Sequence, residues 1–225
     1  MKKALTVLAV LVFLLGAADG WARSEEATRR NNLGTELLRQ ERMEEAIAAF
    51  RMALELDPDY ATARLNLGYT YDRQGQIEEA MAEYRKVTEL DPGNLLAHNN
   101  LGVLHDKRGS YDEAIAEFET VLRLDPSHAV ALKNLENAKR NKGIMQERQE
   151  RLAQARKEAE ANPTDPSASF NLARLYAASG EKDQAIEWLA RALALGLTEF
   201  ALLKDDPAFK TLRDDPRFMQ FLERR

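Results

Sequence analysis

The chain has no cysteine and only three histidines among its 225 residues. Without cysteine it has no disulfide framework, no thiolate metal site and no lipid anchor on an N-terminal cysteine. It also lacks a glycine-rich phosphate loop and a His-Glu-x-x-His motif, which are signatures of nucleotide-dependent and zinc-dependent chemistry. We therefore expect a protein that is not an enzyme and that has no cofactor and no metal site.

Long hydrophobic runs are also missing. The longest covers residues 4–15, whereas a bilayer-spanning helix needs about 20 apolar residues. This run follows two lysines and precedes small residues that end at Ala22, the pattern of a secretory signal peptide. We predict a bacterial signal peptide at residues 1–22, with cleavage after Ala18 as the alternative. The protein would then be periplasmic or secreted, and would contact a membrane only if the signal stays uncleaved as an anchor.

Positive charge is not concentrated anywhere in the chain. Lys and Arg number 32 against 37 Asp and Glu, which gives a net charge of −5. Nucleic-acid binding needs a concentrated basic face, so we exclude nucleic acid as the main ligand. No low-complexity linker follows the signal, which predicts one continuous domain over residues 23–199.

What the chain does contain is a repeat. Asn-Leu-Gly occurs at 32–34, 66–68 and 100–102, in steps of 34 residues, and looser copies occur at 134–136 and 171–173. A period of this size indicates an array of small helical units. Function is then expected on a surface that several repeats share.

The repeated positions have consistent physical properties. We count from position 1, which is Ala27, Ala61, Leu95, Ala129 and Pro166 in the five copies. In the well-preserved copies, positions 8 and 20 are small, so that two helices can approach closely, and positions 7, 11 and 24 are large and fill the space around that crossing. Four copies have glycine at position 15, where the first helix should end and turn: Gly75, Gly109, Gly143 and Gly180. Asp-Pro pairs at 57–58, 91–92 and 125–126 should end the second helix.

These residues resemble the tetratricopeptide repeat over residues 27–199. The resemblance implies an all-α, right-handed superhelical solenoid of about five helix-turn-helix units. The units would cover residues 27–60, 61–94, 95–128, 129–165 and 166–199.

The fourth unit is degenerate. Glu136, Lys139 and Arg148 replace the residues expected at positions 8, 11 and 20, while Leu152 and Ala155 keep positions 24 and 27. We interpret 129–165 as a loosened unit that could act as a hinge. The alternative is a long, charged linker helix.

Residues 200–225 have a small repeat of their own, in which Asp-Pro-x-Phe occurs at 206–209 and 215–218. Aspartate is a good N-cap, and proline suits the first helical position. We expect this tail to cap the exposed apolar end of the fifth unit. Apolar residues near these motifs would form the cover: Leu202, Leu203, Leu212 and Phe221.

The resemblance assigns positions 2, 5, 6, 9, 12 and 13 to a concave face. Position 6 is asparagine in all five units: Asn32, Asn66, Asn100, Asn134 and Asn171. An asparagine amide offers two donors and an acceptor, so a row of them could pair with the main chain of an extended peptide. Leucine and glycine of the motif account for packing, whereas asparagine is not required by it. The alternative is that asparagine is only a tolerated surface residue.

Cations and apolar side chains complete this predicted site. Arg39, Arg73 and Lys107 occupy position 13, and guanidinium groups favour carboxylates, so an acidic segment or a free C-terminus is a suitable ligand. The carboxylate clamp of chaperone-binding repeats has Lys and Asn at positions 5 and 9, which are Asn31 and Thr35 here, so that clamp is not matched. Several apolar residues would serve as anchors: Tyr69, Leu65, Leu96, Val103 and Phe170.

His98 and His105 are seven residues apart and could share a helix face. Because both stand at packing positions of the repeat, we favour packing over a metal pair. Our main hypothesis is a protein-interaction scaffold that binds an extended peptide segment and helps to assemble an envelope or secreted complex. The alternatives are an accessory subunit of an enzyme complex, in envelope biogenesis or cytochrome maturation, and, with the least support, a hydrolase or transferase.

Overall fold

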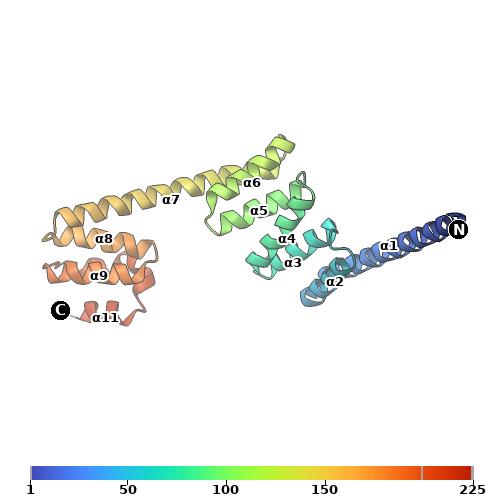
Figure 1. The fold of residues 1–225 in the computed structure, drawn as a ribbon. Coiled ribbons are helices and arrows are strands. Elements are labelled where there is room, and N and C mark those ends of the chain that lie inside the picture. Colours follow the sequence, from blue (N-terminus) through green and yellow to red (C-terminus); the bar gives the residue numbers. More distant parts are fainter. Residues whose placement is uncertain (1, 199, 224–225) are drawn as a thin grey trace. The chain divides into compact units, whose positions relative to one another are not determined.

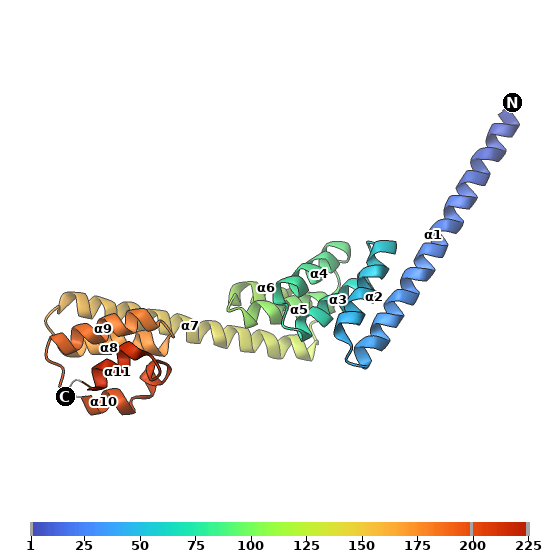
Figure 2. The same ribbon diagram turned by 90° about the horizontal axis from the view of Figure 1, so that it is seen from below.

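The computed structural model describes the backbone of residues 2–198 and 200–223, and the side chains of residues 21–198 and 203–223. In this part of the chain every regular element is a helix (Figures 1 and 2). The elements are α1 (Lys2–Arg39), α2 (Met43–Leu56), α3 (Ala61–Arg73), α4 (Ile77–Leu90), α5 (Leu95–Lys107), α6 (Tyr111–Leu124), α7 (Ala129–Ala161), α8 (Pro166–Ala178), α9 (Lys182–Ala194), α10 (Phe200–Asp205), the 3-10 helix η1 (Pro207–Leu212) and α11 (Pro216–Glu223). The all-α repeat fold is confirmed.

The chain divides into two compact units, which we call unit 1 (Met1–Lys142) and unit 2 (Gly143–Arg225). This division differs from the single continuous domain over residues 23–199 that the lack of a linker predicts. The side chains of the predicted signal peptide lie outside the described part, apart from Trp21 and Ala22. No helix within the described residues has both the length and the apolarity needed to cross a membrane.

Unit 1 contains three helical hairpins, α1–α2, α3–α4 and α5–α6. Gly75 and Gly109 follow the first helices of two of them with φ of 75°, a left-handed conformation that suits glycine. Glu41 takes the same place in the first hairpin with φ of 61°. Asp57, at the end of α2, has extended backbone angles that end the helix just before a proline. These local signals set where each helix of unit 1 stops.

Each hairpin of unit 1 closes on a glycine that faces an aromatic ring. A Cβ atom added to Gly34 would lie 2.6 Å from Phe50, one on Gly68 would lie 2.9 Å from Tyr84, and one on Gly102 would lie 2.5 Å from Phe118. The three rings are at most 1% exposed. In all three hairpins of unit 1, glycine at position 8 therefore matches the aromatic ring at position 24, because a Cβ atom there would force the ring to shift.

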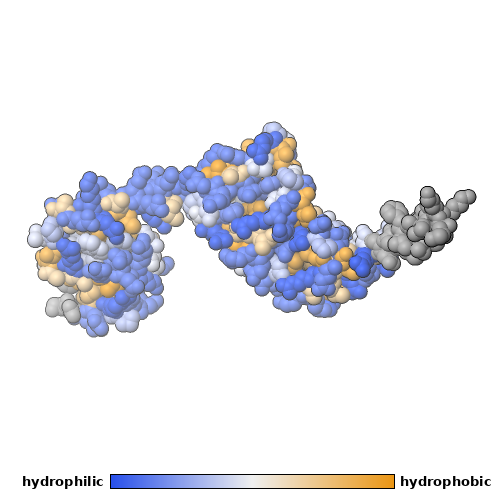
Figure 3. Space-filling model, in the orientation of Figure 1, coloured by the Kyte–Doolittle hydropathy of each residue, from blue (hydrophilic) through white to orange (hydrophobic). Residues whose placement is uncertain are grey.

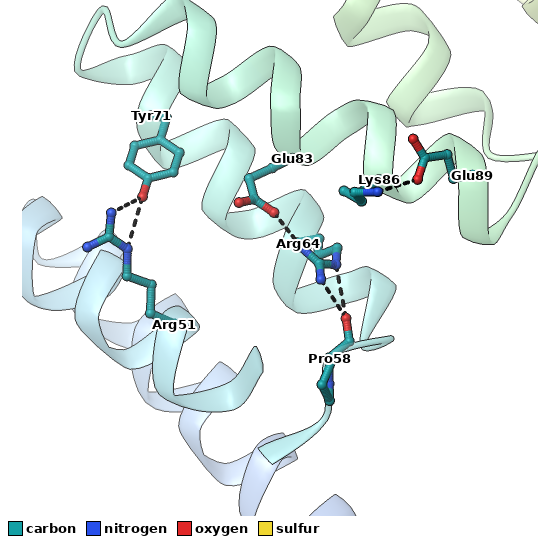
Figure 4. A network of polar contacts seen from close by, with 7 residues as sticks. All are labelled: Arg51, Pro58, Arg64, Tyr71, Glu83, Lys86 and Glu89. Carbon is teal, nitrogen blue, oxygen red and sulfur yellow. Dashed lines mark hydrogen bonds and ion pairs between the residues drawn. The ribbon is translucent and has the colours of Figure 1, made fainter. Parts of the chain in front are cut away.

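Polar side chains tie the second and third hairpins of unit 1 to the loops before them, as Figure 4 shows for Arg64. Arg64 donates to the carbonyl of Pro58 at 2.7 Å and to Glu83 at 2.8 Å. His98, at the same position of the next repeat, contacts the carbonyl of Pro92 at 3.1 Å and Glu117 at 2.6 Å. Position 4 thus anchors the interhelical loop to the second helix of its own hairpin.

The fourth repeat is not a helix-turn-helix unit. Helix α7 runs without a break from Ala129 to Ala161, so the turn expected at Gly143 is absent and the linker-helix alternative is correct. Its early residues Leu135 and Ala138 pack with Ala114 and Phe118 in unit 1. Its later residues Ala155 and Ala159 are buried among unit 2 side chains.

The register of the fourth repeat also needs correction. Arg51 donates to the Tyr71 hydroxyl at 2.6 Å, and Arg156 donates to the Tyr176 hydroxyl at 2.7 Å, each across 20 residues. Counted back from Tyr176, Ala155 therefore occupies position 24, the place of Phe50. The sequence assignment of Leu152 to position 24 is wrong by three residues, because the extra residues of this repeat lie before it.

Replacing Gly143 by alanine should stabilise the protein by about 0.5–1 kcal/mol, because glycine in a helix interior is less favourable than alanine by that amount. No atom lies within 4 Å of the added Cβ. Gly180 is the matched control, since its surroundings are equally open but its φ is +80°. Gly180→Ala should lower stability by about 1–2 kcal/mol. Urea unfolding followed by circular dichroism would measure both, and a loss of stability in Gly143→Ala would indicate a turn there.

Unit 2 is closed by its C-terminal segment. Phe209, Phe218, Leu203 and Leu212 are fully buried against α8 and α9, and the ring of Phe209 lies between those of Phe170 and Phe218, with centroids 5.8 Å and 5.6 Å away. The Asp206 side chain accepts from the backbone of Ala208, and Asp215 accepts from that of Arg217, at 2.9 Å each. Phe221 is partly buried in the same cluster, while the side chain of Leu202 lies outside the described part. The tail thus covers the apolar end of the last hairpin.

Candidate functional site

The first helices of successive repeats in unit 1 lie side by side. Four hydrogen-bonded pairs of side chains join them, each across 35 residues and each from position 6 or 13 of one repeat to position 5 or 12 of the repeat before. The bonds are Asn66 to Asn31 at 2.9 Å, Asn134 to Asn99 at 3.1 Å, Lys107 to Asp72 at 2.8 Å and Asn141 to Asp106 at 3.1 Å. Positions 2, 5, 6, 9, 12 and 13 of α1, α3, α5 and the start of α7 therefore form one surface, which we call the first-helix face.

These bonds correct the role assigned to asparagine. Asn66 and Asn134 donate their amide groups to a neighbouring repeat, so position 6 does contribute to packing. Each bond leaves the Oδ1 acceptor of the donating asparagine for other partners. The persistence of asparagine at this position is explained in part by contacts within the array.

Leucine interrupts this pairing at two points. Leu65 stands at position 5, where Asn31 and Asn99 stand in the neighbouring repeats, and it offers no acceptor to Asn100. Leu38 stands at position 12 and offers none to Arg73. Asn100 and Arg73 therefore make no such contact with the first helix of the preceding repeat, which distinguishes them from Asn66 and Lys107, although Asn100 lies near the hydroxyl of Tyr84 on α4.

Arg73 ends a strip of α3 that also carries two apolar side chains, the partly buried Leu65 and the exposed Tyr69. Leu65, Tyr69 and Arg73 follow one another at four-residue intervals, so they lie along one side of the helix. Tyr69 is 47% exposed, and Leu96 on α5 is 56% exposed. Figure 3 shows apolar patches that interrupt the mostly hydrophilic surface of unit 1. An aromatic ring, an amide and a guanidinium thus border the same strip.

The remaining predicted residues differ in their surroundings. Asn32 is exposed on α1, and Arg39 is exposed beside Glu36 at 3.6 Å. The ammonium group of Lys107 forms an ion pair with Asp72. Asn171 is exposed on α8, in unit 2, so it is not part of the first-helix face that unit 1 contains.

Two apolar assignments were wrong. Phe170 was expected as a groove anchor, but it is only 9% exposed because it packs against Phe209 of the C-terminal segment. Leu33 was expected in the core at position 7, but it is 47% exposed, whereas Leu67 and Leu101 are buried. No helix of a preceding repeat covers Leu33 within the described residues. Sequence reasoning also missed Val130, which is 55% exposed on α7 and extends the face by one repeat.

The histidines serve the packing of unit 1. His98 contacts Glu117 and the Pro92 carbonyl, as described above. Burial lowers the pKa of His105, and the nearby Arg85 guanidinium lowers it further. Within the described residues, no cluster of three or more His, Cys, Asp or Glu side chains is arranged to hold a metal ion.

Comparison with known proteins agrees with this repeat organisation. One family model described as tetratricopeptide repeat matches residues 31–94, 70–129 and 107–162, and a second with the same description matches residues 145–213. No curated protein matches the chain.

Solved tetratricopeptide structures share the fold. The first repeat domain of Spaghetti (RPAP3), bound to the HSP90 peptide SRMEEVD, is 21% identical with a TM-score of 0.51 over 52% of this chain and 93% of that one. The first such domain of human RPAP3 is 19% identical with a TM-score of 0.52 over 55% and 98%. MamA is 22% identical with a TM-score of 0.50 over 81% and 96%. Because the family models match well over half of its residues, the chain belongs to the tetratricopeptide repeat family.

Proposed function

We propose that unit 1 binds an extended acidic segment of a partner protein along the first-helix face. Tetratricopeptide repeat domains mediate protein–peptide binding. The observation that carries the proposal is the interruption of the inter-repeat pairing at Leu65 and Leu38, which leaves Asn100 and Arg73 beside the exposed ring of Tyr69.

The charges of this strip favour a carboxylate ligand. The guanidinium of Arg73 is exposed and forms no ion pair within the described residues, and an unpaired guanidinium binds carboxylates in bidentate geometry. Asn100 can bond the ligand's main chain, and Tyr69 offers a rigid apolar surface. The HSP90 peptide bound to the first repeat domain of Spaghetti, SRMEEVD, is acidic and therefore of this chemistry.

The test begins with a random peptide library displayed on phage and selected on the purified full chain. We expect enrichment of sequences rich in Asp and Glu. For an enriched peptide, fluorescence anisotropy should show that Tyr69→Ala and Arg73→Glu each weaken binding at least about tenfold, equivalent to about 1.4 kcal/mol.

Two matched variants control for general surface effects. Leu124→Ala removes a side chain on α6 that is 48% exposed, close to the exposure of Tyr69, and Lys86→Glu reverses an exposed cation on α4. Both should bind as the native chain does. Enrichment of basic or uncharged peptides, or equal losses in the control variants, would refute the proposal.

The wider role of the protein is proposed from this peptide binding and from the N-terminal sequence. We propose that the protein is a non-enzymatic scaffold that helps to assemble a complex in the bacterial envelope or outside the cell. Residues 1–22 would be its secretory signal, because a 12-residue apolar run lies between a basic start and small residues. N-terminal sequencing of the mature protein tests this, since a mature chain that still begins at Met1 would contradict cleavage.

A further inference from the structure

Unit 2 contains a pocket of about 220 Å³ between the later part of α7 and helix α8. Four residues of α7 and three residues at the end of α8 and just after it line the pocket: Ile144, Glu147, Arg148, Arg151, Leu175, Ala178 and Ser179. It is distinct from the first-helix face, which belongs to unit 1.

The repeat pattern shows what occupies this place elsewhere in the chain. Leu175 stands at position 10 of its repeat, as Thr70 and Leu104 do in unit 1. Those two residues are fully buried, and helix α1, the first helix of the preceding repeat, contacts α3, which carries Thr70. Leu175 is only partly buried because the described residues of unit 2 include no such preceding first helix. The pocket therefore lies where the first helix of a complete preceding repeat would pack.

Arg151 shows that the missing occupant is not an ordinary repeat helix. It lies 15 residues before position 1 of the next repeat, as Ala46 does in unit 1. Ala46 is fully buried at a close helix crossing. An arginine at this place keeps a neutral helix from approaching closely, whereas a helix with carboxylates could pair with it.

The charges at the pocket also favour a helix that carries carboxylates. Arg151 is 74% exposed and forms a long ion pair of 3.9 Å with Glu147, which also lines the pocket, so two arginines stand against one carboxylate there. Arg148 is exposed and has no ion pair in the described part of the chain. Ile144, 52% exposed, adds an apolar contact beside the two cations.

We propose that this pocket binds an amphipathic helix of a partner protein. The apolar side of the helix lies on Ile144, Leu175 and Ala178, and carboxylates one turn apart face Arg148 and Arg151. Arg148 and Arg151 are three residues apart and therefore neighbours on one side of α7, and carboxylates at i and i+4 are likewise neighbours on one side of the partner helix.

The probe is a fluorescein-labelled 16-residue helical peptide with Leu and Ala on one side and two Glu four residues apart at the edge of that side. Anisotropy with the full chain should give saturable binding. Ala178→Trp, which fills the pocket, and the double variant Arg148→Glu, Arg151→Glu should each weaken it at least tenfold. A second peptide with Lys in place of the two Glu should bind the double variant at least tenfold better than the native chain. Lys157→Glu reverses an exposed cation on the same helix outside the pocket and should leave binding unchanged.

Four results would overturn the proposal. Full binding by Ala178→Trp would place the peptide elsewhere, and failure of the Lys peptide to bind the double variant would remove the charge pairing. Tighter binding of a peptide with the sequence of residues 129–142 would make the chain's own helix the occupant. Concentration-dependent dimers in sedimentation, lost in Ala178→Trp, would make it a second copy.

Discussion

Replacing Phe209 by alanine should destabilise unit 2 by about 3–5 kcal/mol, the usual cost of removing a fully buried phenylalanine. Phe209 is fully buried, and its ring lies between those of Phe170 and Phe218. The variant removes the ring of η1 that packs on both Phe170 of α8 and Phe218 of α11, and so it weakens the cover over the apolar end of the array.

Urea unfolding followed by tryptophan fluorescence measures this effect. Trp188 is partly buried in the core of unit 2, whereas Trp21 is 72% exposed, so a cooperative fluorescence change reports mainly on unit 2. Met219→Ala is the control, because Met219 is 44% exposed on α11 and its loss should change stability by less than about 0.5 kcal/mol. An unchanged midpoint in Phe209→Ala would mean that the C-terminal segment contributes nothing to the stability of unit 2.

Gly102→Ala should destabilise the α5–α6 hairpin by about 1–3 kcal/mol through overpacking, since the added carbon would lie 2.5 Å from the buried ring of Phe118. Another hairpin of the same chain shows which residue pair fits at these two positions. The hairpin α8–α9 has Ala173 at position 8 and Leu189 at position 24, and both are fully buried. The double variant Gly102→Ala, Phe118→Leu copies that pair, so its two effects should not add.

Hydrogen exchange of the α5 and α6 amides would give the unfolding free energies for this double-mutant cycle. We expect a favourable coupling energy of about 0.5–3 kcal/mol, the range for residues in direct contact. Strictly additive losses would show that the ring of Phe118 moves away from the new methyl group without cost.

The architecture of unit 1 could be predicted because its determinants are local. Gly75 and Gly109 end helices through their own backbone angles, and Gly68 faces Tyr84 within a single hairpin. Each signal acts over a few residues or within one 34-residue period, so a repeated pattern reveals it.

The fourth repeat could not be predicted in the same way. Gly143 has the same sequence position as Gly75, but a glycine permits a turn without requiring one. In a normal repeat the turn is favoured because the two helices pack on each other, and Glu136, Lys139 and Arg151 replace the residues that would make that contact. Without that contact, continuing the helix adds one hydrogen bond per residue, and α7 continues through Gly143 without a turn.

The candidate site was predicted only in outline. Family resemblance located the face, and the position 6 asparagines do lie on it in unit 1. Whether an asparagine at position 6 bonds to the neighbouring repeat depends on the residue 35 positions earlier. For Asn66 that residue is Asn31, which accepts a hydrogen bond, whereas for Asn100 it is Leu65, which cannot. The burial of Phe170 depended on a C-terminal segment that packs against it from outside its own repeat.

The placement of the unit boundary within α7 has a consequence for how the chain folds as it is synthesised. The contacts that complete unit 1 end with Asn141 and Lys142, which pair with Asp106 and Asp112. Because the chain emerges N-terminus first, from the ribosome and from the translocation channel of an exported protein alike, unit 1 holds all of its own partners before any residue of unit 2 has emerged, and domains generally fold as units. Unit 2 cannot begin early in this way, because Phe170 is buried only after Phe209 has been made.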